Sequence, residues 1–191
     1  MFNLVIFGPP GAGKGTQAKV IAEKLNLVHL SSGEILRQEL IDGEFGPSIQ
    51  KCQAAGILVP NEILIPLMER EITKNLDKAG LIFDGFPRTI VQAELLEQIL
   101  AKHQTSIARI INLQLNQEEA VKRILQRGLE SGRSDDNPET IKDRFVTYEE
   151  KTLPLLNYYR AKGNLIDIDG FPPIPEVSEK IMEALDDLFN K

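Results

Sequence analysis

The fold is decided by two adjacent stretches near the N-terminus, Phe2-Asn3-Leu4-Val5-Ile6-Phe7 and Gly8-Pro9-Pro10-Gly11-Ala12-Gly13-Lys14-Gly15-Thr16. The first is a short apolar run, which is typical of a strand buried on both faces of a parallel sheet. The second is rich in glycine and leads into apolar residues at helical spacing between Ala18 and Leu25. Strand, glycine loop and helix together predict the first half of a βα unit.

The same alternation continues along the chain. Four further strand candidates are Val28–Leu30, Leu81–Asp84, Ile110–Leu113 and Leu165–Ile168. Helical patterns occupy residues 89–102, 117–126, 138–160 and 175–189. We therefore predict an α/β fold in which helices flank a five-stranded parallel sheet.

Two stretches interrupt this alternation. Residues 33–73 contain several helical patterns and no convincing strand. Residues 127–138 are polar, charged and rich in turn-forming residues. We expect both stretches to be excursions from a single domain that spans residues 1–191.

Composition limits the classes of protein to which the chain can belong. With 42% hydrophobic and 26% charged residues, it is ordinary for a globular protein and excludes disorder, collagen and coiled coil as the main architecture. No apolar run approaches the roughly 20 residues that span a bilayer, and the N-terminus lacks signal-peptide features. The single cysteine, Cys52, fits a reducing, cytoplasmic location, and the net charge of −6 argues weakly against nucleic-acid binding.

The glycine-rich stretch matches the phosphate-binding pattern G-x-x-x-x-G-K. Glycines let backbone N–H groups surround phosphate oxygens, and Lys14 supplies a mobile positive charge. The hydroxyl residue that usually follows the lysine and binds Mg²⁺ is replaced by Gly15, so nucleotide phosphates and water are expected to hold the metal. Asp84 ends an apolar strand, as in the Walker-B pattern, and either lies near Mg²⁺ through water or caps a turn before Gly85.

Four motifs occur in a family-specific order. They are Gly8–Thr16, Leu30–Arg37, Asp84–Thr89 with Gln92, and Gly132–Asn137 with Arg144. On these motifs the chain closely resembles the adenylate kinases of the nucleoside monophosphate kinase family over its whole length. The resemblance implies a phosphate-loop core, an AMP-binding lobe near residues 31–60 and a short lid near residues 127–138. It also implies reversible transfer of a phosphoryl group from MgATP to AMP, giving two ADP.

The resemblance assigns roles on the ATP side residue by residue. The phosphate loop wraps the ATP phosphates, residues 170–172 pack on the base, and Arg127 serves mainly ATP. The residues assigned to ATP are Gly11, Ala12, Gly13, Lys14, Gly15, Thr16, Arg123, Arg127, Gly170 and Pro172.

The resemblance assigns a second set to AMP. In this set Arg37 and Arg88 reach the AMP phosphate, and Gln92 reads adenine. A glutamine amide can accept from the exocyclic amine of adenine and donate to a ring nitrogen, whereas guanine presents the opposite pattern. The residues assigned to AMP are Ser32, where the family usually has threonine, Arg37, Ile57, Leu58, Val59, Gly85, Phe86, Pro87, Arg88, Gln92, Arg133 and Arg144.

Catalysis in this family is expected from charge and positioning, because the AMP phosphate needs no general base. The residues expected around the transferring group are Lys14, Arg88, Arg127, Arg133 and Arg144. Asp135 and Asp136 either orient lid arginines or form a surface turn, and Gly128 and Gly132 are candidate flexible points. Both histidines, His29 and His103, are expected to have structural or surface roles.

The lid is too short, and contains no cysteine, to suggest a structural zinc site. The expected partners are ATP, AMP and ADP, with no nucleic acid and no membrane, and a monomer follows from the family tendency. Two alternatives stay open. One is a UMP/CMP kinase with the same loop and lid. The other is a nucleotide-dependent switch module, although the chain lacks its guanine-reading Asn-Lys-x-Asp motif.

Overall fold

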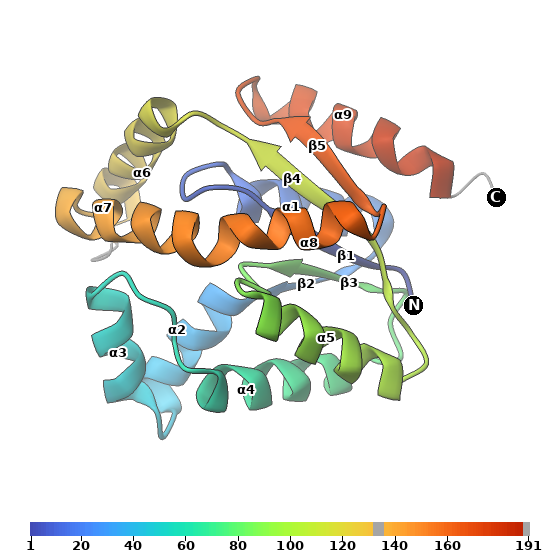
Figure 1. The fold of residues 1–191 in the computed structure, drawn as a ribbon, viewed down its shortest axis with the longest axis horizontal. Helices are drawn as coiled ribbons and strands as arrows, with labels where there is room; N and C mark the ends of the chain where they lie inside the picture. The colour runs from blue at the N-terminus through green and yellow to red at the C-terminus, as the bar shows by residue number, and fades with distance from the viewer. Residues whose placement is uncertain (132–135, 189–191) are drawn as a thin grey trace.

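Five strands form one parallel sheet in the part of the chain that the computed structural model describes, residues 1–131 and 136–188 (Figure 1). The strands are β1 (Asn3–Phe7), β2 (Val28–Ser31), β3 (Leu81–Asp84), β4 (Ile107–Gln114) and β5 (Leu165–Asp169). Their order across the sheet is β2-β3-β1-β4-β5, and every neighbouring pair is parallel. The predicted α/β class and five-stranded parallel sheet are confirmed.

The central strand β1 explains why the opening run is almost wholly apolar. All five of its residues are buried, and successive side chains point to opposite faces. Leu4 and Ile6 belong to one hydrophobic cluster, and Val5 and Phe7 belong to another. A strand whose side chains pack into a hydrophobic cluster on each face of the sheet cannot alternate apolar with polar residues.

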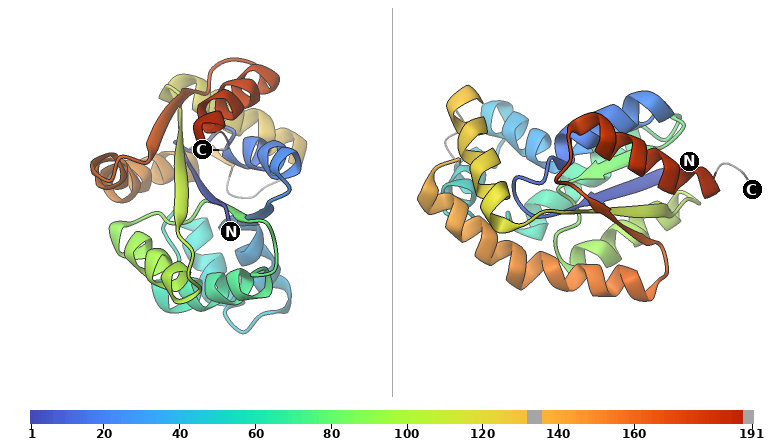
Figure 2. Two further views of the ribbon diagram at one scale, coloured as in Figure 1. Left: turned by 90° about the vertical axis from the view of Figure 1, so that its right-hand side faces the viewer. Right: turned by 90° about the horizontal axis from the view of Figure 1, so that it is seen from above.

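Helices cover both faces of the sheet (Figure 2). They are α1 (Lys14–Leu25), α2 (Ser32–Asp42), α3 (Gly46–Ala54), α4 (Asn61–Lys74), α5 (Ile90–Lys102), α6 (Gln117–Ser131), α7 (Pro138–Thr147), α8 (Leu153–Ala161) and α9 (Ile174–Leu185). Helices α1 and α9 supply the cluster around Leu4 and Ile6, while α4, α5 and α8 supply the cluster around Val5 and Phe7. The stretch from residue 33 to residue 73 is helical, as predicted, and contains α2, α3 and most of α4.

The polar stretch from residue 127 is partly misassigned by the sequence prediction. Residues 127–131 continue helix α6 instead of forming a turn. Arg, Leu and Glu are good helix formers, and a polar composition also suits an exposed helix face. Gly128 is within this helix, where an added Cβ would lie 3.0 Å from the backbone oxygen of Asp136. In the structure this glycine permits close approach of the chain before α7. Gly132 and Asp135 lie outside the described residues.

The helical pattern over residues 138–160 was predicted as one helix but contains a π-helical turn. Residues 148–152 form that turn between α7 and α8. Pro154 stands in the first turn of α8 and has no N–H to donate to the carbonyl four residues earlier. The missing donor accounts for the change in hydrogen-bond pattern at this point.

The C-terminal pattern, predicted to reach residue 189, forms α9 and then a 3₁₀ turn, Asp186–Leu188. Residues 189–191 lie outside the described part of the chain. Across residues 1–131 and 136–188, no helix combines the length and apolar character needed to cross a membrane.

Candidate active site

A cavity of about 1290 Å³ opens at the carboxyl ends of β1 and β3. This is the edge where the chain leaves neighbouring strands in different directions, which is where ligands bind in open parallel sheets. The cavity wall is built from segments that are distant in sequence: the loop after β1, the start of α2, residues 56–59, the end of β3, helices α6 and α7, and the segment before α9.

The loop between β1 and α1 forms one side of the cavity. Gly8, Gly11 and Gly13 all have positive φ angles, of 145°, 83° and 84°. At Gly11 an added Cβ would lie 2.4 Å from the backbone oxygen of Ala120, so only glycine fits there. Helix α1 begins at Lys14, and its unpaired N–H groups give the loop a partial positive charge.

Lys14 folds back over this loop. Its ammonium donates to the backbone oxygens of Gly8 and Pro9, both at 2.8 Å. The pKa of Lys14 is lowered to about 7, mainly by burial; Asp84 opposes this shift, and Arg88, Arg144 and Arg127 add to it. A phosphate bound in this loop would replace the two carbonyls and favour the charged ammonium.

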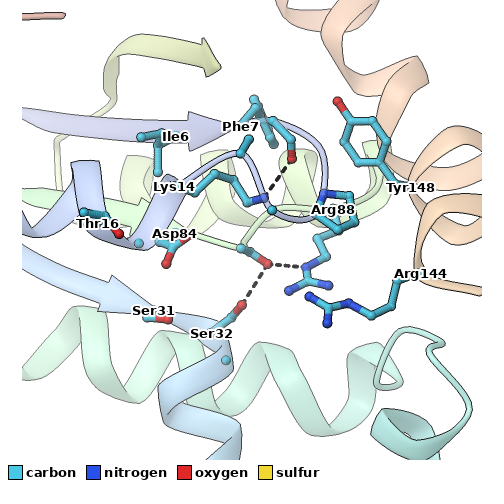
Figure 3. A pocket seen from close by; sticks show the side chains of 18 of the residues that line it. Ile6, Phe7, Lys14, Thr16, Ser31, Ser32, Asp84, Arg88, Arg144 and Tyr148 are labelled. Carbon is cyan, nitrogen blue, oxygen red and sulfur yellow. Dashed lines mark hydrogen bonds between the residues drawn. The ribbon is translucent and has the colours of Figure 1, made fainter. Parts of the chain in front are cut away.

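Asp84 lies at the end of β3, beside Lys14 (Figure 3). His29 Nε2 is 3.4 Å from Asp84 Oδ2, within ion-pair range. Burial opposes ionisation of the carboxyl, but His29 and Lys14 outweigh it and hold the pKa of Asp84 below its usual range. The cavity therefore contains a fixed carboxylate among several cations.

Three residues meet at one backbone carbonyl on the opposite side of the cavity (Figure 3). The Ser32 hydroxyl donates to the Gly85 oxygen at 2.8 Å, and Arg88 Nε donates to the same oxygen at 2.7 Å. Gly85 has φ 73°, and an added Cβ there would lie 2.7 Å from Ser32 Oγ. These contacts hold the Arg88 guanidinium in the space toward which Arg144 also points.

A buried carboxylate holds two arginines between α6 and α7. Asp136 accepts two bonds from Arg127, at 2.7 and 2.6 Å, and one from Arg144, at 3.0 Å. The Asp136 side chain has no exposed surface. Burial opposes its ionisation, but the two guanidinium groups hold the pKa of Asp136 below its usual range. Of the two interpretations drawn from the sequence, Asp136 fits the one in which it orients arginines.

Arg123 connects α6 to the segment before α9. Its guanidinium donates to the backbone oxygens of Gly170 and Phe171, both at 2.9 Å, and to Glu119 at 2.9 Å. These bonds fix the position of the residues expected to pack on the ATP base.

The comparisons with known proteins agree with this geometry. The family model for adenylate kinase matches residues 6–164. The chain belongs to the adenylate kinase family. It is 42% identical to the adenylate kinase of Parabacteroides distasonis over 98% of this chain and all of that one. It is 43% identical to the adenylate kinase of Flavobacterium johnsoniae over 98% of this chain. It is 42% identical to that of Leptospira biflexa over 97% of this chain, and both matches cover the whole of the relative.

Almost all residues that the adenylate kinase resemblance assigned to nucleotides line this one cavity, together with Asp84, which the Walker-B pattern assigned to Mg²⁺. They are Gly11, Ala12, Gly13, Lys14, Gly15, Thr16, Ser32, Arg37, Ile57, Leu58, Val59, Asp84, Gly85, Pro87, Arg88, Gln92, Arg123, Arg127, Arg144, Gly170 and Pro172. Phe86 is different, because it is 1% exposed and packs in the hydrophobic cluster behind the cavity. Arg133 lies outside the described residues.

The surroundings of Asp84 fit the Mg²⁺ that adenylate kinases use with ATP. An added Cβ at Gly15 would lie 3.2 Å from Asp84 Oδ2, so the glycine leaves room beside an ionised carboxylate. Among residues 1–131 and 136–188, no three side chains of His, Cys, Asp or Glu gather into a metal-binding group. A hydrated Mg²⁺ that depends on nucleotide phosphates for most of its ligands needs only one such carboxylate.

Sequence reasoning missed two partners of the site residues. His29 was expected to have a structural or surface role, and its contact with Asp84 was not foreseen. Asn61, not considered at all, accepts a bond from the Gln92 amide at 2.9 Å. The first contact depends on the pairing of β2 with β3, in which His29 lies opposite Ile82, two residues before Asp84. No local pattern in the sequence encodes that pairing.

Proposed function

We propose that this chain catalyses the reversible transfer of the γ-phosphoryl group of MgATP to AMP, giving two ADP. The observation that carries the proposal is the arrangement of cations in one cavity. The phosphate loop with Lys14, Arg37 of α2, Arg88 after β3, Arg127 of α6 and Arg144 of α7 all line it. Figure 3 shows the side chains of Arg88 and Arg144 pointing toward the same space. One cavity thus offers cationic groups for two phosphate chains.

The chemistry proposed for these residues is positioning and stabilisation of charge. The AMP phosphate is already ionised and serves as nucleophile without a general base. The loop amides and Lys14 hold the donor phosphates, and Arg88 and Arg37 hold the acceptor phosphate. Arg127 and Arg144 neutralise charge on the transferring group, since planar guanidinium groups bind phosphate oxygens in pairs.

Asp84 would hold the Mg²⁺ through its water ligands. The metal supplies neutralisation of charge on the donor phosphates. Asp84 stays ionised under the reaction conditions because its pKa is below the usual range.

Two parts of the chain are proposed to move around the substrates. Residues 31–60 form the AMP-binding lobe, and residues 127–138, including Arg133, form the lid. Closure brings arginines to the transferring group and removes water that would otherwise hydrolyse ATP. Asp136 supports this assignment, because it binds Arg127 and Arg144 together. Arg133 is proposed to act with Arg144.

We also propose that the protein acts as a cytoplasmic monomer on ATP, AMP and ADP alone. The monomer follows the family tendency, and the compartment follows from the single cysteine. Gel filtration with light scattering checks the first part, since a mass near 21.3 kDa is expected.

The alternative of a UMP/CMP kinase differs only in the base that is accepted. Gln92 lines the cavity and favours adenine. The alternative of a switch module does not require phosphate-binding arginines on two sides of one cavity, so we give it no further weight.

The test is to incubate the protein with MgATP and, separately, AMP, CMP, UMP or GMP, and to quantify every nucleotide by chromatography. We expect rapid transfer with AMP, and two ADP formed for each AMP consumed. Faster phosphorylation of UMP or CMP would refute the base assignment. Binding of ATP without transfer to any acceptor would refute the enzyme assignment.

A further inference from the structure

The Gln92 amide is held at both of its polar atoms. Its Oε1 accepts from the backbone N–H of Arg88 at 2.8 Å, and its Nε2 donates to Asn61 Oδ1 at 2.9 Å. The side chain is 1% exposed, and the backbone N–H of Gln92 bonds to the Thr89 hydroxyl that caps helix α5. Both the place and the orientation of the amide are therefore fixed.

The two anchors leave a defined pair of groups on Gln92. A glutamine amide has two N–H donors and two acceptor lone pairs, and each anchor uses one. One donor and one acceptor remain on a side chain that lines the cavity. Adenine offers the matching pair, because its ring N1 accepts and its exocyclic amine donates. A 6-oxopurine offers the reverse pair, an N1–H donor and an O6 acceptor.

Recognition of a 6-oxopurine would require the Gln92 amide to turn over. Nε2 would then face the Arg88 N–H, and Oε1 would face Asn61 Oδ1, so that the Asn61 amide would have to turn as well. The backbone N–H cannot adapt, and like groups would oppose each other in a buried position, which costs more than a lost bond between exposed groups. Asn61 lies behind Gln92 in the first turn of α4 and does not itself line the cavity.

We propose that Asn61 is a positioning residue that sets the preference for adenine over 6-oxopurines by fixing the orientation of the Gln92 amide. The proposal rests on the proposed function, in which Gln92 faces the base of the acceptor nucleotide. In this proposal Asn61 contributes only its acceptor oxygen, which holds Nε2 of Gln92 in place.

The experiment compares three variants with the wild type. Asn61→Leu removes the acceptor, and Asn61→Asp keeps an acceptor and cannot turn to become a donor. Glu62→Gln alters an exposed neighbour in the same helical turn and serves as the matched control. For each protein, kcat and KM are measured with AMP and with IMP at saturating MgATP. Where IMP is not phosphorylated, its inhibition constant against AMP replaces KM.

We expect Asn61→Leu to lower the preference for AMP over IMP about tenfold, mainly through KM for AMP, with KM for MgATP unchanged. Asn61→Asp and Glu62→Gln should keep the wild-type preference. A merely structural role would lower activity with both acceptors equally, and that result, or an unchanged preference in Asn61→Leu, would overturn the proposal.

Two further outcomes are informative. If Asn61→Leu does not fold, as judged by its melting temperature, the smaller Asn61→Ala, which also removes the acceptor, takes its place: a lowered preference for AMP supports the proposal, and an unchanged preference refutes it. If the wild type transfers to no nucleoside monophosphate, or prefers a pyrimidine, the proposed function fails and this inference fails with it. If the wild type prefers AMP and Asn61→Leu keeps that preference, the inference alone fails.

Discussion

At the scale of single residues, Lys14 links nucleotide binding to pH. Burial is the largest cause that lowers the pKa of its ammonium to about 7, so Lys14 is mostly neutral in the free protein at pH 8. Bound phosphates favour the charged form and raise this pKa. We predict that binding of MgATP without acceptor takes up nearly one proton at pH 8, measured by calorimetry in two buffers of different ionisation enthalpy.

Because uptake requires a neutral Lys14 in the free protein, a lower pH and a Lys14 variant both serve as controls. As pH falls toward 6, Lys14 is already protonated in the free protein, so proton uptake should disappear. Lys14→Met should abolish the uptake at pH 8, at concentrations that saturate the variant. Identical binding heats in the two buffers for the wild type at pH 8 would contradict the prediction.

Residues that belong to a motif could be predicted from sequence, whereas their partners could not. Lys14 and Arg88 stand in short patterns whose chemistry is local. The contact of His29 with Asp84 requires the pairing of two strands, and the bond of Asn61 to Gln92 joins residues 31 positions apart. Phe86 shows that a residue within a binding motif can direct its side chain into the core.

At the scale of elements, the phosphate loop packs against helix α6. Two of its glycines allow the cost of a left-handed backbone to be measured separately from the cost of a steric overlap with α6. Gly11 and Gly13 have nearly equal φ angles, 83° and 84°. An added Cβ would lie 2.4 Å from the Ala120 oxygen at Gly11 but would meet nothing within 4 Å at Gly13. We predict that Gly13→Ala costs about 1–2 kcal/mol of unfolding free energy for its left-handed backbone. Gly11→Ala should cost about 1–3 kcal/mol more, for overlap.

Urea unfolding of the two variants without nucleotide measures this difference, because both backbones bear the same strain. The comparison uses stability instead of activity, since both residues belong to the proposed ATP site. Equal losses in the two variants would show that the loop can move away from α6 without cost.

Elements were predicted well where burial dictates the pattern. The inner strands β1 and β3 are buried on both faces and almost wholly apolar, so their sequences alone indicate strands. The edge strands β2 and β5 are only partly buried and contain His29 and Asp167, so they were found from the alternation of strands with helices. Residues 127–131 were not recognised as part of α6, because polar residues are equally compatible with a turn and with an exposed helix face. The π-helical turn at residues 148–152 depends on Pro154 and on packing between α7 and α8, which periodicity does not reveal.

At the scale of the whole molecule, the cavity is assembled from at least six separate segments, from residue 6 to residue 177. Both substrates must be enclosed before transfer, and both ADP molecules must leave after it. Thr147 Oγ1 donates to the Gly56 oxygen at 3.0 Å, so α7 contacts the segment that leads to residues 57–59. The proposed AMP-binding lobe is therefore tied to the C-terminal end of α7, the helix that follows the proposed lid.

We predict that opening and product release, not transfer, limit turnover. The cationic groups are already gathered in one cavity, so the transfer step needs little rearrangement once the cavity is closed. Rapid-quench kinetics with MgATP and AMP should then show a burst of ADP in the first turnover, before a slower steady rate. Replacing the transferred phosphoryl by a thiophosphoryl slows the chemical step alone and should abolish the burst. A linear time course with the natural substrates would instead show that transfer itself is slowest.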